Sequence, residues 1–103
     1  MLVLKFEWDE EKNNINRIKH GVTFKEASTV FKDANAIFLY DYAHSQDEEW
    51  FVVIGYSTEM RLLYVCHCYR ESETVVRIIS ARKAGKYEIK LYEEGGLWKI
   101  TVY

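Results

Sequence analysis

The spacing of apolar residues changes along the chain, and each change predicts a different secondary structure. Residues 2–7 alternate loosely between apolar and polar side chains and predict a short strand. Asp9 is a favourable helix N-cap and Gly21 is a residue type that commonly follows a helix, so we predict a polar helix between them. Residues 23–32 open with a Thr-x-x-Glu capping box and carry an apolar stripe, which predicts a second helix.

From residue 36 onward the apolar pattern repeats every second residue, which is the period of a strand. A last helix is predicted over residues 83–94, before two glycines. The element order, β-α-α-β-β-β-β-α, predicts an α+β fold. We expect an antiparallel sheet with the two N-terminal helices and the C-terminal helix on one face, and the other face partly open. The predicted strands are 36–42, 50–57, 61–69 and 74–81, and the tail 97–103 could add an edge strand or meet a partner.

Composition narrows the class of protein. A chain of 103 residues that is 49% apolar can bury one core, so we expect residues 1–103 to form a single domain and exclude a disordered chain. The N-terminal segment is charged too soon for a signal peptide, and no apolar run approaches the length of a membrane-spanning helix. We therefore expect a cytoplasmic protein that does not bind membranes.

The two cysteines, Cys66 and Cys68, lie two residues apart on a predicted strand, at a separation that does not favour a disulfide. His67 lies between them and should point to the opposite face, which leaves too few ligands for a metal site. We expect buried free thiols, and neither a metal nor a cofactor.

Charge is distributed unevenly, although the formal net charge is only −2. Residues 33–59 carry six acids and no Lys or Arg, whereas residues 60–90 carry seven bases and three acids. A compact basic surface on an otherwise acidic protein suits a local anionic ligand better than a long track for nucleic acid. Solvated surface charge explains the same composition about equally well.

The last predicted strand carries the strongest functional signal. It is rich in β-branched residues and then presents Arg82 and Lys83 where the pattern turns helical. Cations at the start of a helix oppose its macrodipole, but the same position suits a bound anion such as a phosphate. Arg77 adds a third cation within the strand, although a cross-strand pair with Glu49 or Glu59 is an equally good explanation of it.

Side-chain alternation along the last two strands suggests which residues meet. One plausible pairing places Arg61, His67 and either Arg77 or Arg82 around a concave patch. Arg61 is also explained as a solvated residue after the hairpin turn. A histidine inside a strand, such as His67, is more often a half-buried polar residue.

No residue stands out as a general base. Lys19 and His20 lie at a helix C-terminus, where the favourable interaction of a cation with the helix macrodipole is sufficient to explain their presence. His44 lies in a loop among acids and is expected to be a surface residue. The available candidates are His20, His67, Glu49 and Tyr92.

Several segments, taken together in order and spacing, resemble the BrnT family of ribonuclease toxins from bacterial type II toxin–antitoxin systems. The resemblance covers roughly residues 6–92. It rests on Phe6-Glu7-Trp8-Asp9, Lys12, Asn14, Lys19-His20-Gly21-Val22, Phe24-Lys25-Glu26-Ala27, Val30-Phe31, Asp41, His44, Glu48-Glu49, Ile54-Gly55, Ser57, Arg61-Leu62-Leu63, the run from Arg77 to Ala84, Glu88 and Tyr92.

The resemblance implies a RelE-like fold and a metal-independent ribonuclease that cuts messenger RNA and stalls translation. It also implies a ribbon-helix-helix antitoxin of the BrnA type, through which the complex would bind operator DNA. We expect catalysis to involve Arg61, Arg77, Arg82 and His67, and RNA contacts to involve Lys19, His20, Lys83 and Lys86.

One residue departs from the family pattern, because Trp50 stands where an arginine usually follows the glutamates. If that arginine contacts RNA or holds an acid, the departure implies weaker activity or a changed sequence preference. The alternative function is therefore a catalytically weak or inactive module that holds its antitoxin and tunes regulation of the operon. A third possibility is a structural domain whose basic patch binds only an acidic partner.

Overall fold

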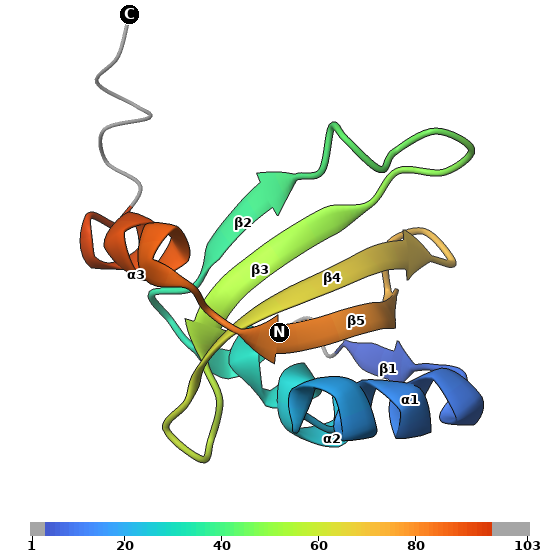
Figure 1. The fold of residues 1–103 in the computed structure, drawn as a ribbon. Helices are drawn as coiled ribbons and strands as arrows, with labels where there is room; N and C mark the ends of the chain where they lie inside the picture. The colour runs from blue at the N-terminus through green and yellow to red at the C-terminus, as the bar shows by residue number, and fades with distance from the viewer. Residues whose placement is uncertain (1–3, 96–103) are drawn as a thin grey trace, which may run out of the picture.

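The computed structural model describes residues 4–95, and the predicted C-terminal tail over 97–103 lies outside this range. Figure 1 shows a single sheet with helices packed around it. Its elements are β1 (Lys5–Glu7), α1 (Glu10–His20), α2 (Phe24–Ser28), the 3-10 helix η1 (Thr29–Lys32), β2 (Ile37–Tyr40), β3 (Phe51–Tyr56), β4 (Leu62–Arg70), β5 (Val75–Lys83) and α3 (Lys86–Glu93).

The sheet is mixed, and in this respect the prediction of an antiparallel sheet was wrong. Strands β2, β3, β4 and β5 pair antiparallel in sequence order, as predicted. The short β1, however, lies parallel to β5 at the edge, so the strand order is β1-β5-β4-β3-β2. Sequence alternation indicates a strand but not its neighbour, which here lies about seventy residues further along the chain.

Helix α1 begins and ends where its capping residues predicted, and α2 begins after its predicted N-cap but ends at Ser28, where the chain continues to Lys32 as η1. Asp9 caps α1 with its side chain, and Gly21 ends the helix with a left-handed φ of 69°. The Thr23 hydroxyl accepts a hydrogen bond from the backbone of Glu26 at 3.1 Å. The capping box is only half formed, because the Glu26 carboxylate turns instead toward Arg61.

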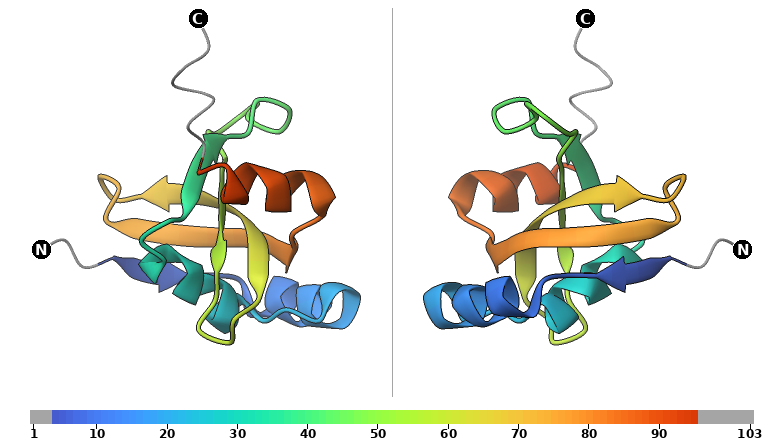
Figure 2. Two further views of the ribbon diagram at one scale, coloured as in Figure 1. Left: turned by 90° about the vertical axis from the view of Figure 1, so that its left-hand side faces the viewer. Right: turned by 90° about the vertical axis from the view of Figure 1, so that its right-hand side faces the viewer.

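Helices cover both faces of the sheet, although the sequence led us to expect one covered face. The α1 face, which α1, α2 and η1 cover, holds the main core, whereas α3 lies on the opposite side, here called the α3 face (Figure 2). The main core comprises Val22, Phe24, Ala27, Val30, Val53, Leu63, Val65, Val76, Ile78 and Ala81, and the core under α3 comprises Ile37, Val52, Ile54 and Leu91.

Strand β5 runs further than predicted, so Arg82 and Lys83 belong to the strand and not to the opening of a helix. The sheet pairing continues because the Ala84 backbone donates to β4, at 2.9 Å. Gly85 then caps α3, and its backbone nitrogen donates to Glu88 Oε1 at 2.6 Å. The proposed conflict between these cations and a helix macrodipole therefore does not arise.

A β-bulge in β5 decides which side chains share a face. The pairing of β4 with β5 skips Ile79, so this strand carries one unpaired residue. Arg77 and Arg82 are five residues apart and would face opposite sides of a regular strand. With the bulge between them, both lie on the α3 face, opposite Cys68 and Tyr64 respectively.

Within residues 4–95, no helix combines the length and the apolar character that crossing a bilayer requires.

Candidate functional site

The structure divides the four residues expected to take part in catalysis between the two faces of the sheet. Arg61 and His67 lie on the α1 face, where Arg61 contacts Glu26 of α2 and the His67 ring packs against Phe31 of η1. Arg77 and Arg82 lie on the α3 face. The single concave patch predicted from strand alternation is therefore not formed, and the two pairs have different surroundings.

Arg61 ties the turn between β3 and β4 to α2. Its Nε donates to Glu26 Oε2 at 2.9 Å, and its Nη2 donates to the Gly21 carbonyl at 3.0 Å. Glu26 is only 6% exposed and also accepts from Ser57 Oγ at 2.7 Å. The hydrogen bond from Arg61 lowers the pKa of Glu26 despite its burial. These contacts give Arg61 a supporting role in the fold.

His67 is buried inside an aromatic cluster. Its imidazole is 0% exposed and lies 4.9 Å from the Phe31 ring and 6.2 Å from the Phe51 ring, centroid to centroid. Its Nε2 is 3.2 Å from the Tyr69 hydroxyl. Burial lowers the pKa of His67 to about 4, so the ring is neutral near pH 7. As predicted, it faces away from Cys66 and Cys68, which are buried free thiols.

Arg77 forms a part-buried ion pair with a neighbouring strand. Its Nη1 lies 2.9 Å from Glu7 Oε2 on β1. The alternative partners expected from sequence were Glu49 and Glu59, and the structure provides neither of these contacts. Because an arginine has five N–H donors, the pair with Glu7 fixes the guanidinium and leaves other donors available to an anion.

Arg82 is held by two partners on the α3 face. Its Nη1 lies 3.1 Å from Glu88 Oε1, and its guanidinium carbon lies 4.0 Å from the centre of the Tyr64 ring. The hydrogen bond from Arg82 lowers the pKa of Glu88. Burial raises the pKa of the Tyr64 hydroxyl, which therefore stays protonated near neutral pH. This arrangement orients the cation across the sheet surface.

The expected RNA-contacting residues lie near the middle and the C-terminal end of β5. Lys19 and His20 lie at the end of α1 and line a pocket of about 200 Å³. Ser80, which lies between Arg77 and Arg82 along β5, lines the same pocket. Lys83 ends the strand and Lys86 begins α3, and both side chains are exposed. These residues could supplement an anion site on β5, but the structure gathers none of them into a closed pocket.

The Asp41–His44 pair is a feature that reasoning from sequence missed. His44 Nδ1 lies 2.9 Å and 3.1 Å from the two carboxylate oxygens of Asp41. The Asp41 side chain is 12% exposed, whereas that of His44 is 67% exposed. A carboxylate at Nδ1 orients an imidazole and favours the tautomer that leaves Nε2 free to accept a proton. The Asp-x-x-His spacing in a loop was the available signal.

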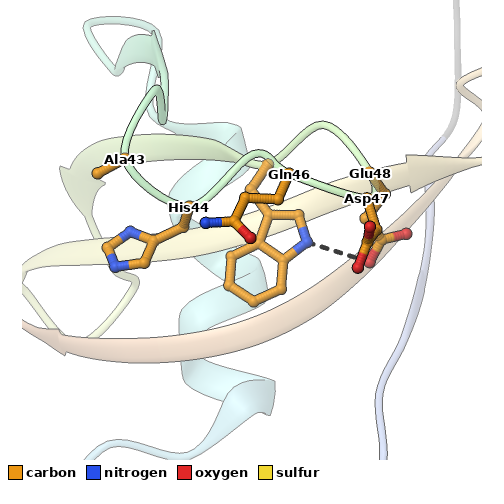
Figure 3. Close-up of a pocket in the computed structure, with 6 residues that line it drawn as sticks. Ala43, His44, Gln46, Asp47 and Glu48 are labelled. Atoms are coloured by element: carbon orange, nitrogen blue, oxygen red, sulfur yellow. Dashed lines mark hydrogen bonds between the residues drawn. The ribbon is translucent and has the colours of Figure 1, made fainter.

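A pocket of about 450 Å³ opens beside this pair (Figure 3). The His44 and Trp50 rings are nearly parallel, with an interplanar angle of 26° and centroids 6.4 Å apart. Trp50 Nε1 donates to Glu48 Oε1 at 3.0 Å. The lining residues are Ala43, His44, Gln46, Asp47, Glu48 and Trp50.

Cys68 connects this pocket to the basic edge of the α3 face. Its sulfur is 4.0 Å from Glu48 Oε1, and its backbone lies opposite Arg77 on β5. The charges of Glu48 and Arg77 both act on the pKa of the Cys68 thiol, which burial raises. The α3 face therefore carries an aromatic, acidic pocket on one side and the two arginines on the other.

Comparison with known proteins identifies relatives of the chain. Residues 8–88 match the family model described as the ribonuclease toxin BrnT of type II toxin–antitoxin systems. The crystal structure of the Brucella abortus ribonuclease toxin BrnT aligns with a TM-score of 0.62 and 22% sequence identity, covering 82% of this chain and 100% of that chain. At this identity the structural likeness shows a shared fold. No curated protein matches the chain.

Proposed function

The chain belongs to the BrnT family of ribonuclease toxins of type II toxin–antitoxin systems, and from this premise we propose that it cleaves messenger RNA without a metal ion and so stops translation. We further propose that its fold belongs to the RelE-like superfamily. The main support is the arrangement of the α3 face, where Arg77 and Arg82 lie opposite Cys68 and Tyr64, and where the charge of Asp41, the partner of His44, acts on the pKa of Tyr64 and of Cys66.

In the proposed reaction, the 2′-hydroxyl of one nucleotide attacks the adjacent phosphorus. His44 Nε2 accepts the hydroxyl proton, and Asp41 orients the ring and stabilises the imidazolium that forms. The bond from phosphorus to the 5′-oxygen breaks, and that oxygen takes up a proton from a solvent water, while the His44 imidazolium returns its proton to the solvent. The products are a 2′,3′-cyclic phosphate and a free 5′-hydroxyl. General base catalysis of this kind contributes about 10²–10⁴-fold.

Arg77 and Arg82 would stabilise the charge that develops on the phosphorus-bound oxygens. Fixed donors aimed at developing charge are among the largest catalytic contributions, because they need no reorganisation during the reaction. Glu7 and Glu88 hold the two guanidiniums in place. Because the nucleophile belongs to the RNA itself, the reaction does not need a metal-activated water. His67 takes no part in this scheme, and Arg61 acts only by supporting the fold.

The proposed partner is a ribbon-helix-helix antitoxin of the BrnA type, which would neutralise the toxin. Operator DNA would be bound through the antitoxin and not by this chain alone. The support is the family description, which places BrnT in type II toxin–antitoxin systems, together with the net charge of −2. A chain with a net negative charge has little electrostatic attraction for duplex DNA.

A second candidate function is a binding module that holds the antitoxin without cutting RNA. The observation that favours it is that Arg77 and Arg82 both already pair with carboxylates of the same chain. If those pairs served stability alone, the antitoxin complex would form and RNA would stay intact.

The test is induction in a bacterium with and without the antitoxin, with new RNA 5′-ends mapped over time. We expect growth arrest and new 5′-ends from the wild type, and rescue by the antitoxin. Arg77→Ala, Arg82→Ala and His44→Asn should each abolish or greatly slow cleavage. Arg17→Ala removes an exposed cation of α1, away from the α3 face, and serves as the matched control.

Purified protein then tests the chemistry. Cleavage of a short RNA should persist in excess EDTA and should yield a 2′,3′-cyclic phosphate. Loss of cleavage on chelation would contradict the metal-independent reaction. Intact RNA with abundant, folded wild-type protein that still binds the antitoxin would favour the binding module.

A further inference from the structure

We propose that the pocket lined by Asp47 and Trp50 is a nucleobase subsite that selects guanine next to the cleaved phosphate. The proposal rests on the proposed ribonuclease function and adds a substrate preference to it. The pocket shares His44 with the proposed catalytic pair (Figure 3), and its Glu48 lies 4.0 Å from the sulfur of Cys68, the residue opposite Arg77.

Trp50 provides a surface on which a base can stack. The indole plane is fixed because Nε1 donates to Glu48, and the His44 ring extends the aromatic surface at an interplanar angle of 26°. The pocket volume of about 450 Å³ leaves room beside these rings. Proteins that bind single-stranded RNA commonly stack its bases on such aromatic side chains. Stacking gives affinity for any base, so selectivity must come from the polar lining.

Two carboxylates line the pocket, and their contacts distinguish them. Both oxygens of Glu48 have partners, since Oε1 accepts from Trp50 and Oε2 lies 3.1 Å from Arg70 Nη1. Asp47 has no hydrogen-bond or ion-pair partner in residues 4–95 and lies beside Glu48 on the pocket wall (Figure 3). Asp47 is therefore the carboxylate available to a ligand.

A free carboxylate offers two hydrogen-bond acceptor oxygens and no donor, so it selects the base that presents two adjacent donors. The Watson–Crick edge of guanine presents two adjacent donors, N1–H and the N2 amino group, which match the two oxygens of Asp47. Adenine and cytosine each present one donor beside an acceptor, and uracil presents one donor between two acceptors. The amide of Gln46, on the same pocket wall, can donate to guanine O6.

The charge distribution orients the bound strand. Asp41, Asp47, Glu48 and Glu49 make the loop acidic, so a phosphate is repelled from it while a base with exposed donors is attracted. The nearest phosphate is drawn instead toward Arg77, across Cys68. This orientation brings the ribose between base and phosphate toward His44.

The test is binding of six-nucleotide RNAs that carry 2′-O-methyl groups, which block cleavage but keep the base edges. Four such RNAs differ only in one central base, and fluorescence anisotropy measures their dissociation constants. We expect the guanine RNA to bind about 10–100-fold more tightly than the others, the range for a bidentate base contact. Equal binding of all four by the folded wild type would overturn the proposal.

Two matched substitutions examine the carboxylate. Asp47→Asn keeps the shape of the side chain but replaces one of its two acceptor oxygens by an NH₂ donor. Guanine binding should therefore weaken at least about tenfold, and adenine, which presents one donor and one acceptor, should bind better relative to guanine. Glu49→Gln removes an adjacent acid that does not line this pocket and should leave the guanine preference unchanged. Asp47 would be excluded as the selecting group if Asp47→Asn kept the preference for guanine. It would also be excluded if Glu49→Gln alone lost that preference.

The aromatic surface has its own pair of variants. Trp50→Phe keeps a stacking surface and should retain guanine preference with weaker affinity, whereas Trp50→Ala should weaken all four RNAs about tenfold or more. Thermal melting of each variant confirms that it is folded. Equal affinity of Trp50→Ala and the wild type would overturn the stacking role.

Cleavage and binding separate the two proposals. If the wild type cuts RNA with no preference for guanine at the cut site and Asp47→Asn cuts the same sites, the guanine subsite is wrong and the ribonuclease stands. If the protein binds the guanine RNA selectively but cuts nothing, the ribonuclease function is wrong and the subsite stands.

Discussion

At the scale of single residues, the contacts and the sheet face of each ionisable side chain separate those that hold the fold from those that can meet a ligand. Arg61 and His67 looked as suitable for catalysis in the sequence as Arg77 and Arg82. His67 is fully buried, and Arg61, although about 32% exposed at the side chain, donates to the buried Glu26 and to the Gly21 carbonyl on the α1 face. Arg77 and Arg82, about 31% and 39% exposed, lie on the α3 face. His44 is far more exposed than His67 and has an orienting carboxylate.

Removing Arg61 should destabilise the protein without touching the α3 face. Arg61→Ala would leave the Glu26 carboxylate buried without its counter-charge, and we expect a loss of about 2–3 kcal/mol in the free energy of unfolding. Urea denaturation measures the change. Adding Glu26→Gln to this variant should recover part of the stability, because the amide carries no charge. RNA cleavage per folded molecule should be unchanged, and a specific loss of cleavage would instead assign Arg61 to the active site.

His67 should make stability depend on pH in a narrow window. Its pKa is 6.5 in the unfolded chain and about 4 in the fold, so the unfolded state binds more protons between these values and stability falls as pH falls through them. Between pH 7 and pH 5 the loss should be about 2 kcal/mol. His67→Gln should flatten the urea-denaturation profile over this range, and an equally steep profile in that variant would contradict the assignment.

At the scale of secondary-structure elements, local signals predicted where most elements lie, and tertiary contacts moved their ends. The Asp9 cap and the glycine after α1 act between near neighbours, so sequence alone was sufficient there. The end of β5 was not predictable in this way, because pairing with β4 extends the strand through Lys83. The bulge at Ile79 was not predicted, because no sequence signal for it was identified.

The docking of α3 should depend on one shared carboxylate. Asp33 Oδ2 accepts from the Tyr92 hydroxyl at 2.7 Å and from the Tyr56 backbone at 2.8 Å. Tyr92→Phe removes only the first bond, so we expect about 1 kcal/mol of lost stability and faster hydrogen exchange in α3 than in β4. Cleavage should fall modestly, because Glu88 on α3 orients Arg82.

Exchange in Tyr92→Phe that rises equally in every element would show a global effect and contradict this docking role. Tyr87→Phe provides the matched control, since the Tyr87 side chain lies on the same helix and is 67% exposed. That variant should leave both exchange and cleavage unchanged.

At the scale of the whole molecule, charge separation should make RNA binding only weakly dependent on salt. Few cationic side chains would contact the RNA strand, and acidic residues surround the proposed nucleobase pocket. With about three phosphate contacts, the slope of log K against log salt should be about −2. Arg77→Ala should make this slope shallower by about 0.7, measured by anisotropy with the 2′-O-methyl RNA. A slope near −6 for the wild type would indicate a longer nucleic-acid track than the structure suggests.

The sequence by itself determined the α+β class, most element positions and the family, because caps, periodicity and motif order are properties of the chain. Only the tertiary structure decided that β1 pairs parallel to β5 and that α3 lies opposite the other helices. It also decided the site, since a one-residue bulge reverses the faces of all residues beyond it. Arg77 and Arg82 thereby share a surface, while His67 is enclosed on the other side.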